Sequence, residues 1–240
     1  MSWFLILVIS LGAGTLSGII GFGGTTIVMP ILVLTFGPKA AIPIMAIAAV
    51  LGNLARIIVW WSAINWRAVG AYAITAVPGA ALGARVMLEL DPVLLDIILG
   101  GFFIALIPIR RWFTNSGMRI SLIGLFSAGA VIGYLTGIVA NTGPINAPFF
   151  LAHGLVKGPF IGTEAMSSFF MFSSKAASFR YFGALPDEII LSGVIVGSSL
   201  MAGVWIAKRI VQNLDENQFR GLIDAVLLIA GTAMILGAFL

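Results

Sequence analysis

Two glycine- and proline-rich breaks interrupt long apolar stretches of this sequence, and they constrain the fold more than any other feature. The first break, residues 18–30, reads Gly-Ile-Ile-Gly-Phe-Gly-Gly-Thr-Thr-Ile-Val-Met-Pro and ends an apolar run at 3–20 that is long enough to cross a bilayer. Glycine lets the backbone turn without a side-chain clash and leaves N–H and C=O groups uncovered. In lipid, such backbone is tolerated only where it is buried in protein or faces a water-filled cavity. A broken helix at membrane depth is therefore a candidate binding site.

The composition predicts a membrane protein. Of the 240 residues, 60% are hydrophobic and only 9% are charged, whereas soluble domains carry about 25% charged residues. At roughly 20 residues per span, the chain holds about eight to ten membrane segments. No cysteine and a single histidine are present, which excludes disulfides, thiol chemistry and a histidine-rich metal site. We therefore expect no metal and no cofactor.

The second break, residues 137–148, repeats the first. It reads Gly-Ile-Val-Ala-Asn-Thr-Gly-Pro-Ile-Asn-Ala-Pro, with the same Gly-Ile start, an interior glycine and a closing proline. The sequence is therefore interpreted as an internal duplication, with a first repeat at 1–113, a basic cytoplasmic connector at 114–119 and a second repeat at 120–240. Three pairs of residues are each separated by 119 positions: Gly18 and Gly137, Gly24 and Gly143, and Arg56 and Lys175.

Lysine and arginine in the loops predict how the repeats are oriented. If each half crosses the membrane an odd number of times, seven basic loop residues share one side and two lie on the other. Basic loops favour the cytoplasm, so both termini are expected outside it. The expected fold is an all-α, polytopic bundle in the cytoplasmic (inner) membrane, made of two inverted repeats with broken helices at the Gly-rich motifs. The seven basic residues on the expected cytoplasmic side are Arg67, Arg110, Arg111, Arg119, Lys157, Lys208 and Arg209. The two on the other side are Lys39 and Arg85.

The residue types at the two breaks favour an anion. A helix that begins after a break presents unpaired N–H groups and the positive end of its dipole. Hydroxyl and amide side chains beside the breaks add neutral donors. The alternative is that the glycines only allow helices to pack closely, as small residues do in membranes. The expected binding residues at the breaks are Gly23, Gly24, Thr25, Thr26, Asn141, Thr142, Gly143 and Asn146.

Arg56 and Lys175 lie well inside apolar segments, at equivalent positions of the two repeats. A cation within the membrane is costly and by default indicates a function. If both side chains point inward, we expect them to meet in one central anion pocket, which Asn53, three residues before Arg56, would also line. The alternative is that these long side chains reach the interface or hold helices together.

Two titratable residues are candidates for coupling transport to a proton or another ion. Glu164 precedes Lys175 by eleven residues, which is about three helical turns, so the two share a face. His153 could also titrate. Each has a plainer interpretation, Glu164 as a carboxylate near the start of its helix and His153 as a loop residue.

At the two breaks the sequence resembles the TauE/SafE family of sulfite and organosulfur-anion permeases. The matching residues are 18–24, with Pro30 downstream, and the echo from 137 to 148. Within this echo, residues 141–144 have one glycine where the family often has several. The resemblance covers almost the whole chain. It implies a membrane transporter of sulfite, sulfoacetate, thiosulfate or a related anion, exchanged with or driven by ion gradients.

Together these features predict a secondary transporter, not an enzyme, that moves a small sulfur-containing anion by alternating access at a central site between the repeats. The expected partners are the anion, the lipid bilayer and a proton or other coupling ion, with no nucleic acid; a homo-oligomer is left open. The alternatives are an anion channel of the same build and a membrane assembly protein without transport.

Overall fold

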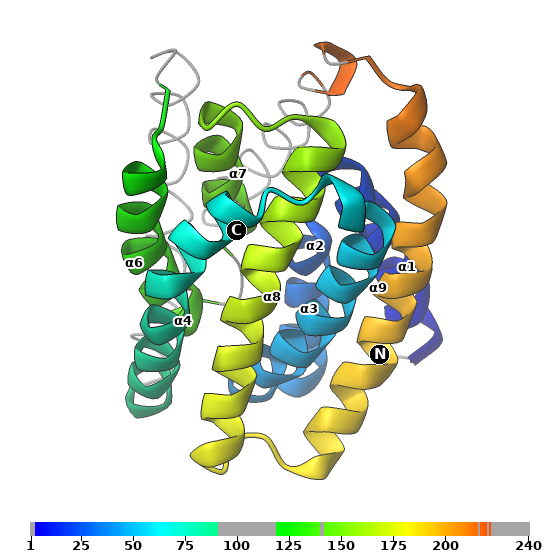
Figure 1. Cartoon of the computed structure of the whole chain (residues 1–240). Coiled ribbons are helices and arrows are strands. Elements are labelled where there is room, and N and C mark those ends of the chain that lie inside the picture. The colour runs from blue at the N-terminus through cyan, green and yellow to red at the C-terminus, as the bar shows by residue number, and fades with distance from the viewer. Residues whose placement is uncertain (1–2, 91–118, 140–141, 216, 220, 222–240) are drawn as a thin grey trace, which may run out of the picture.

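All regular elements of the described chain are helices. The computed structural model describes residues 3–90, 119–139, 142–215, 217–219 and 221, apart from the side chains of Thr26, Pro38 and Pro144. The all-α prediction is confirmed for these residues (Figure 1). The first half contains α1 (Trp3–Ile20), α2 (Gly24–Phe36), α3 (Pro38–Trp60), a 3-10 helix (Trp61–Ala63) and α4 (Trp66–Glu89). The second half contains α6 (Leu122–Ile138), α7 (Gly143–Ala152), α8 (Lys157–Tyr181) and α9 (Asp187–Asn213).

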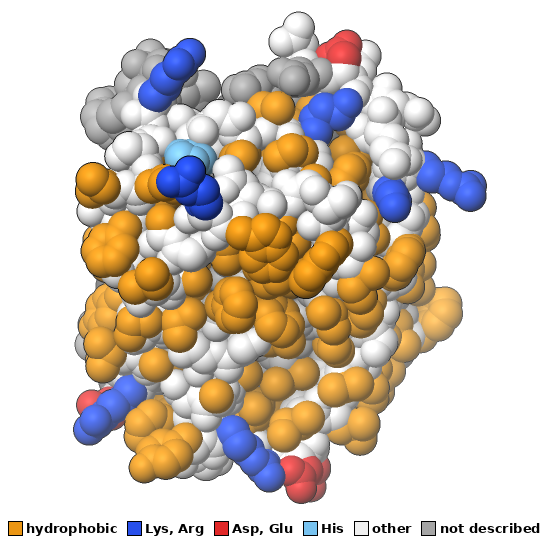
Figure 2. Space-filling view, viewed as in Figure 1, with side chains coloured by type: hydrophobic (Ala, Val, Ile, Leu, Met, Phe, Trp, Pro, Cys, Tyr) orange, Lys and Arg blue, Asp and Glu red, His pale blue; other side chains and the backbone are white. Residues whose placement is uncertain are grey.

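The described helices have the lengths and surface of a membrane protein. Four of them are long and apolar enough to cross a bilayer: α1, α4, α9 and the stretch Lys39–Ala63, which includes most of α3. Figure 2 shows apolar side chains over the middle of the molecule and charged side chains at its two ends. This distribution is expected when the middle of a protein faces hydrocarbon and its ends face water.

Each Gly-rich break lies at the tip of a helical hairpin. In the first half, the rings of Trp3, at the start of α1, and Phe36, at the end of α2, have their centroids 5.6 Å apart. In the second half, the Ile120 N–H donates to the Ala152 carbonyl oxygen at 3.0 Å, so the chain just before α6 lies beside the end of α7. Each hairpin therefore returns to the end of the molecule from which it started.

The helices repeat along the chain as the sequence does. A shift of 119 positions carries the starts of α1, α2 and α3 onto the starts of α6, α7 and α8. The helix contacts show the same equivalence. Helices α1 and α3 of the first half pack on α9 of the second, and their counterparts α6 and α8 pack on α4 of the first. The first helix of each half thus packs against the fourth helix of the other half, and the two halves interlock.

Small residues bring these interlocked helices into close contact. A Cβ added at Gly14 of α1 would lie 2.2 Å from the carbonyl oxygen of Leu200 on α9. A Cβ at the equivalent Gly133 of α6 would lie 2.3 Å from the carbonyl oxygen of Ala76 on α4. Membrane helices associate through such faces because lipid provides no hydrophobic drive to bring them together. These glycines therefore serve helix packing.

The central helices α3 and α8 are equivalent in the two halves and run antiparallel. Trp60, at the end of α3, covers Gly158, at the start of α8, and Arg56 pairs with Glu164 at the same end. In Figure 1, α4 descends from cyan to green while its counterpart α9 ascends from yellow to orange. Equivalent helices of the two halves thus run in opposite directions.

Described basic residues are more numerous at one end of the molecule. The Lys157 Nζ donates to the Leu214 carbonyl oxygen at 2.6 Å, and the Asn65 N–H donates to Thr163 Oγ1 at 2.9 Å. These bonds bring the starts of α4 and α8 and the end of α9 together. That end carries Arg67, Arg119, Lys157, Lys208 and Arg209, and the opposite end carries Lys39, Arg85 and Arg180, while Arg110 and Arg111 lie outside the described residues.

The close α4–α6 contact generates a first prediction. Gly133→Ala should destabilise the protein by about 1–3 kcal/mol, because the new methyl group overpacks the interface with Ala76. Gly12 of α1, where an added Cβ would meet no described atom within 4 Å, is the matched control. Gly12→Ala should leave stability unchanged or raise it by up to about 1 kcal/mol. Thermal unfolding midpoints of the purified variants in detergent test this, and equal midpoints for the two would contradict it.

Candidate functional site

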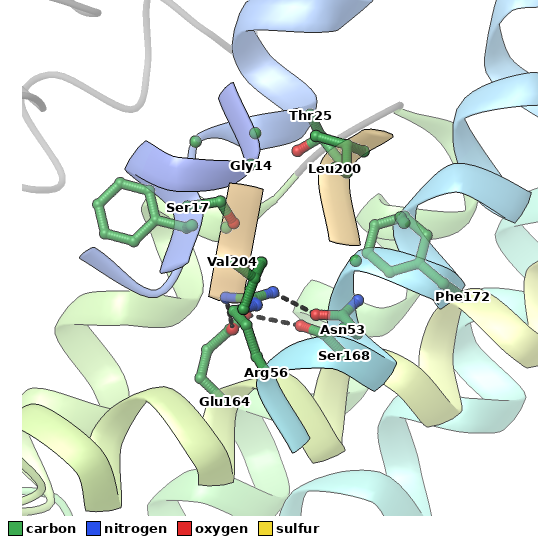
Figure 3. A pocket seen from close by; sticks show the side chains of 16 residues that line it. Gly14, Ser17, Thr25, Asn53, Arg56, Glu164, Ser168, Phe172, Leu200 and Val204 are labelled. Atoms are coloured by element: carbon green, nitrogen blue, oxygen red, sulfur yellow. Dashed lines mark hydrogen bonds and ion pairs between the residues drawn. The ribbon is translucent and has the colours of Figure 1, made fainter. Parts of the chain in front are cut away.

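A small cavity lies between the two hairpin tips and the central helices α3 and α8. Water-sized spheres can occupy about 30 Å³ of it, which is room for one or two water molecules. Gly23, Gly24 and Thr25 of the first break line it together with Gly143 of the second. Further polar side chains come from α3 (Asn53, Arg56), α8 (Glu164, Ser168) and α1 (Ser17) (Figure 3). Apolar side chains make up much of the rest of the lining: Phe22, Phe172, Leu200 and Val204.

The N-termini of two broken helices reach this cavity. Gly21 and Gly23 reverse the chain after α1 with φ angles of 85° and 100°, which residues with a Cβ rarely adopt. The reversal lets α2 begin at Gly24, and α7 begins at Gly143; both residues line the cavity. The N-terminus of a helix carries about half a positive charge. Both hairpins therefore contribute positive potential to one small space.

Arg56 is the buried cation of the cavity, with 6% of its surface exposed. Its Nη1 donates to Glu164 Oε2 at 2.9 Å, and its Nη2 donates to Asn53 Oδ1 (Figure 3). Its Nε is buried and has no hydrogen-bond partner among the described residues. A guanidinium carries five N–H donors in a planar fork that suits oxyanions. Arg56 thus has one N–H without a hydrogen-bond partner among the described residues.

Glu164 connects Arg56 to a chain of buried polar side chains. Ser168 Oγ donates to Glu164 Oε1 at 2.6 Å, Asn146 Nδ2 donates to Ser168 Oγ at 3.4 Å, and the Tyr72 hydroxyl donates to Asn146 Oδ1 at 2.5 Å. The chain joins α4, α7 and α8. Ser168 follows Glu164 by four residues, a spacing that places both on one helix face, whereas nothing in the sequence singles out Tyr72.

Lys175 lies apart from the cavity. Its Nζ is fully buried and donates to the carbonyl oxygens of Thr136 and Val139 at 2.7 and 2.8 Å. These belong to the C-terminal end of α6, where a cation is favourable. Because α3 and α8 are antiparallel, equivalent residues near their C-terminal ends lie at opposite ends of the helix pair. Glu164 is paired with Arg56, and Lys175 lies eleven residues further along α8, which is about 16 Å. Arg56 and Lys175 therefore do not meet in one pocket.

Of the remaining expected residues, Thr142 and His153 lie on the second hairpin. Thr142 is buried, and its hydroxyl bonds to the hydroxyl of Thr136. His153 follows α7, with Nδ1 2.8 Å from the Ile120 carbonyl oxygen, at the end of this hairpin away from its tip. Asn141 lies outside the described residues. Thr26 lies in the first turn of α2, and its side chain is likewise outside the described part.

The polar chain generates a second prediction. Tyr72→Phe removes the hydroxyl donor and leaves Asn146 Oδ1 without that partner in a buried site, which should cost about 1–3 kcal/mol of unfolding free energy. Tyr181, which is 84% exposed, is the matched control, and Tyr181→Phe should change stability by less than about 0.5 kcal/mol. Thermal unfolding of both purified variants checks this. An unfolding midpoint of Tyr72→Phe equal to that of the control would show that the hydroxyl contributes nothing.

Comparison with protein families agrees with this architecture. A family model described as Sulfite exporter TauE/SafE matches residues 6–234, a range that contains both Gly-rich breaks and every described residue that lines the cavity. No curated protein and no solved structure matches the chain. The family consists of membrane transport proteins, which accords with the apolar helices and with the charged and polar side chains buried among them. The chain belongs to the sulfite exporter TauE/SafE family.

Proposed function

We propose that this protein is a secondary transporter that carries a small sulfur-containing anion, such as sulfite or sulfoacetate, across the cytoplasmic membrane. The observation that carries the proposal is a buried arginine with an N–H that has no partner among the described residues, beside a cavity that two helix N-termini also line. A guanidinium binds the planar or tetrahedral face of an oxyanion through paired hydrogen bonds. Helix N-termini add N–H donors and positive potential at the same place. The family of the chain supports transport as the activity.

The geometry supports alternating access around this cavity. The hairpin tips approach it from opposite ends of the molecule, and the equivalent helices run in opposite directions, as inverted repeats would. The cavity has room for one or two waters, less than a sulfonate group needs. A bound anion therefore requires the tips or the side chains around Arg56 to shift, and opening toward one end or the other would release it there.

The proposed orientation places the end with more basic residues in the cytoplasm. That end carries Arg67 and Lys157, whereas α1 begins at Trp3 beside Phe36, at the opposite end. Basic residues favour the cytoplasmic side of a membrane. We therefore propose that the N-terminus lies outside the cytoplasm and that the cavity is nearer the cytoplasmic face, because Arg56 is only one turn from the end of α3.

A thermal-shift screen of the purified protein tests the binding site. Sulfite, sulfoacetate, thiosulfate, sulfate, methanesulfonate and short carboxylates are compared, because a ligand that binds the folded state raises its stability by mass action. The double variant Arg56→Gln/Glu164→Gln removes the cation without leaving its carboxylate unpaired. It should bind at least about tenfold more weakly, which corresponds to the loss of one charge-assisted hydrogen bond.

The exposed Arg67 at the start of α4 supplies the matched control, and Arg67→Gln should keep the full ligand shift. An unchanged shift in the double variant would remove Arg56 from the site. Proteoliposomes loaded with the best ligand then test the activity. Saturable counterflow supports a carrier, and a conductance in planar bilayers without saturable counterflow would identify a channel instead.

A further inference from the structure

The carboxylate of Glu164 occupies a place at Arg56 where an anion would bind. Its Oε2 lies 2.9 Å from Arg56 Nη1, and its Oε1 accepts the Ser168 hydroxyl at 2.6 Å, so both oxygens are engaged. Arg56 Nη2 is bonded to Asn53. Two of the five guanidinium N–H groups are thus engaged, and an anion that contacts the guanidinium from the cavity either lies beside the Glu164 carboxylate or takes its place.

Charge balance opposes an anion while Glu164 is ionised. Arg56 and Glu164 are 6% and 1% exposed, and they are the charged side chains among the described residues that line the cavity. Together they are neutral. A monoanion added to the ionised pair would leave an uncompensated negative charge in a site removed from water, which is costly. A proton on Glu164 restores neutrality and releases the guanidinium.

The other half of the molecule shows that a buried cation here does not need a carboxylate. A shift of 119 positions relates Glu164 to Met45. Lys175, the counterpart of Arg56, is held by the carbonyl oxygens of Thr136 and Val139 instead. A carboxylate opposite Arg56 is thus a feature of one half only, and helix packing does not require it.

We propose that Glu164 and the anion compete for Arg56, so that the anion binds only when Glu164 takes up a proton, and one proton moves with each monoanion. This rests on the proposed function, since it assumes that the anion binds at Arg56. Protonated Glu164 can still donate to Ser168 or Asn53, so the carboxyl group stays hydrogen-bonded after it has left the guanidinium.

Among the described groups around the site, Glu164 is the one suited to this titration. Arg56 on α3 stays charged. Tyr72 on α4 is linked to Glu164 through Asn146 and Ser168, and Lys175, further along α8, is bonded to α6. The cavity residues of α1, α2, α7 and α9 include no titratable side chain.

Calorimetric titration of the full chain with methanesulfonate tests the competition, because a sulfonate keeps its charge from about pH 5.5 to about pH 8.5. Wild type should bind about tenfold more tightly for each unit that the pH falls while free Glu164 is ionised. Repeating the titration in buffers of different ionisation heat should show about one proton taken up per anion. Glu164→Gln should bind with little pH dependence and take up no proton. Glu188→Gln, which changes an exposed carboxylate at the start of α9, should behave as wild type.

The same titration of the double variant Arg56→Gln/Glu164→Gln distinguishes the claim that the anion binds at Arg56 from the claim that it competes with Glu164. Binding that needs Arg56 but takes up no proton in wild type, or keeps its pH dependence in Glu164→Gln, overturns the competition and leaves the anion site standing. Binding by the double variant as tight as that of wild type, or no binding by wild type at any pH, overturns both. If Glu164→Gln does not fold, Glu164→Asp keeps a carboxyl group and must still take up the proton; failure to do so also overturns the competition.

Discussion

Backbone N–H and C=O groups within a bilayer need partners inside the protein, and the organisation of this chain depends on that constraint. Both helical breaks sit at hairpin tips that are covered by other helices. At the second tip, the ammonium of Lys175 satisfies carbonyl oxygens at the end of α6. At the first tip, the equivalent cation Arg56 donates hydrogen bonds to Glu164 and Asn53 instead. The carbonyl oxygens at the second tip are thereby bonded to its cation, while the first tip borders a cavity where Arg56 has an N–H without a partner in the described part of the chain.

The frame around the tips is held by close helix contacts. Gly14 and Gly133 bring α1 against α9 and α6 against α4 with almost no space for a side chain, and the exchange of partners interlocks the halves. Buried polar side chains are concentrated instead on α3, α7 and α8, and those of α3 and α8 line one side of the cavity. Tight apolar packing outside and a small polar network inside would suit the proposed carrier, because the frame can stay intact while the network rearranges.

Much of this fold follows from the sequence, and the failures have identifiable causes. The apolar runs predict the helices, the glycine patterns predict the two breaks, and the 119-residue spacing predicts the matching starts of α1 and α6. The same spacing does not reveal where equivalent residues lie in space. Residues of an antiparallel pair meet only near the crossing point, so Arg56 and Lys175, both near helix ends, lie far apart. Tyr72 could not be predicted, because its partner Asn146 comes from a distant hairpin.

The position of the bound anion is the most direct test of this account. Crystals grown with selenite in place of sulfite would locate the anion through anomalous scattering from selenium, since the chain itself contains none. We predict a peak beside the Arg56 guanidinium, between the N-termini of α2 and α7, with the Glu164 carboxyl group displaced from its present contact. A peak confined to Lys175 or to the molecular surface, with the Arg56–Glu164 pair intact, would contradict the account.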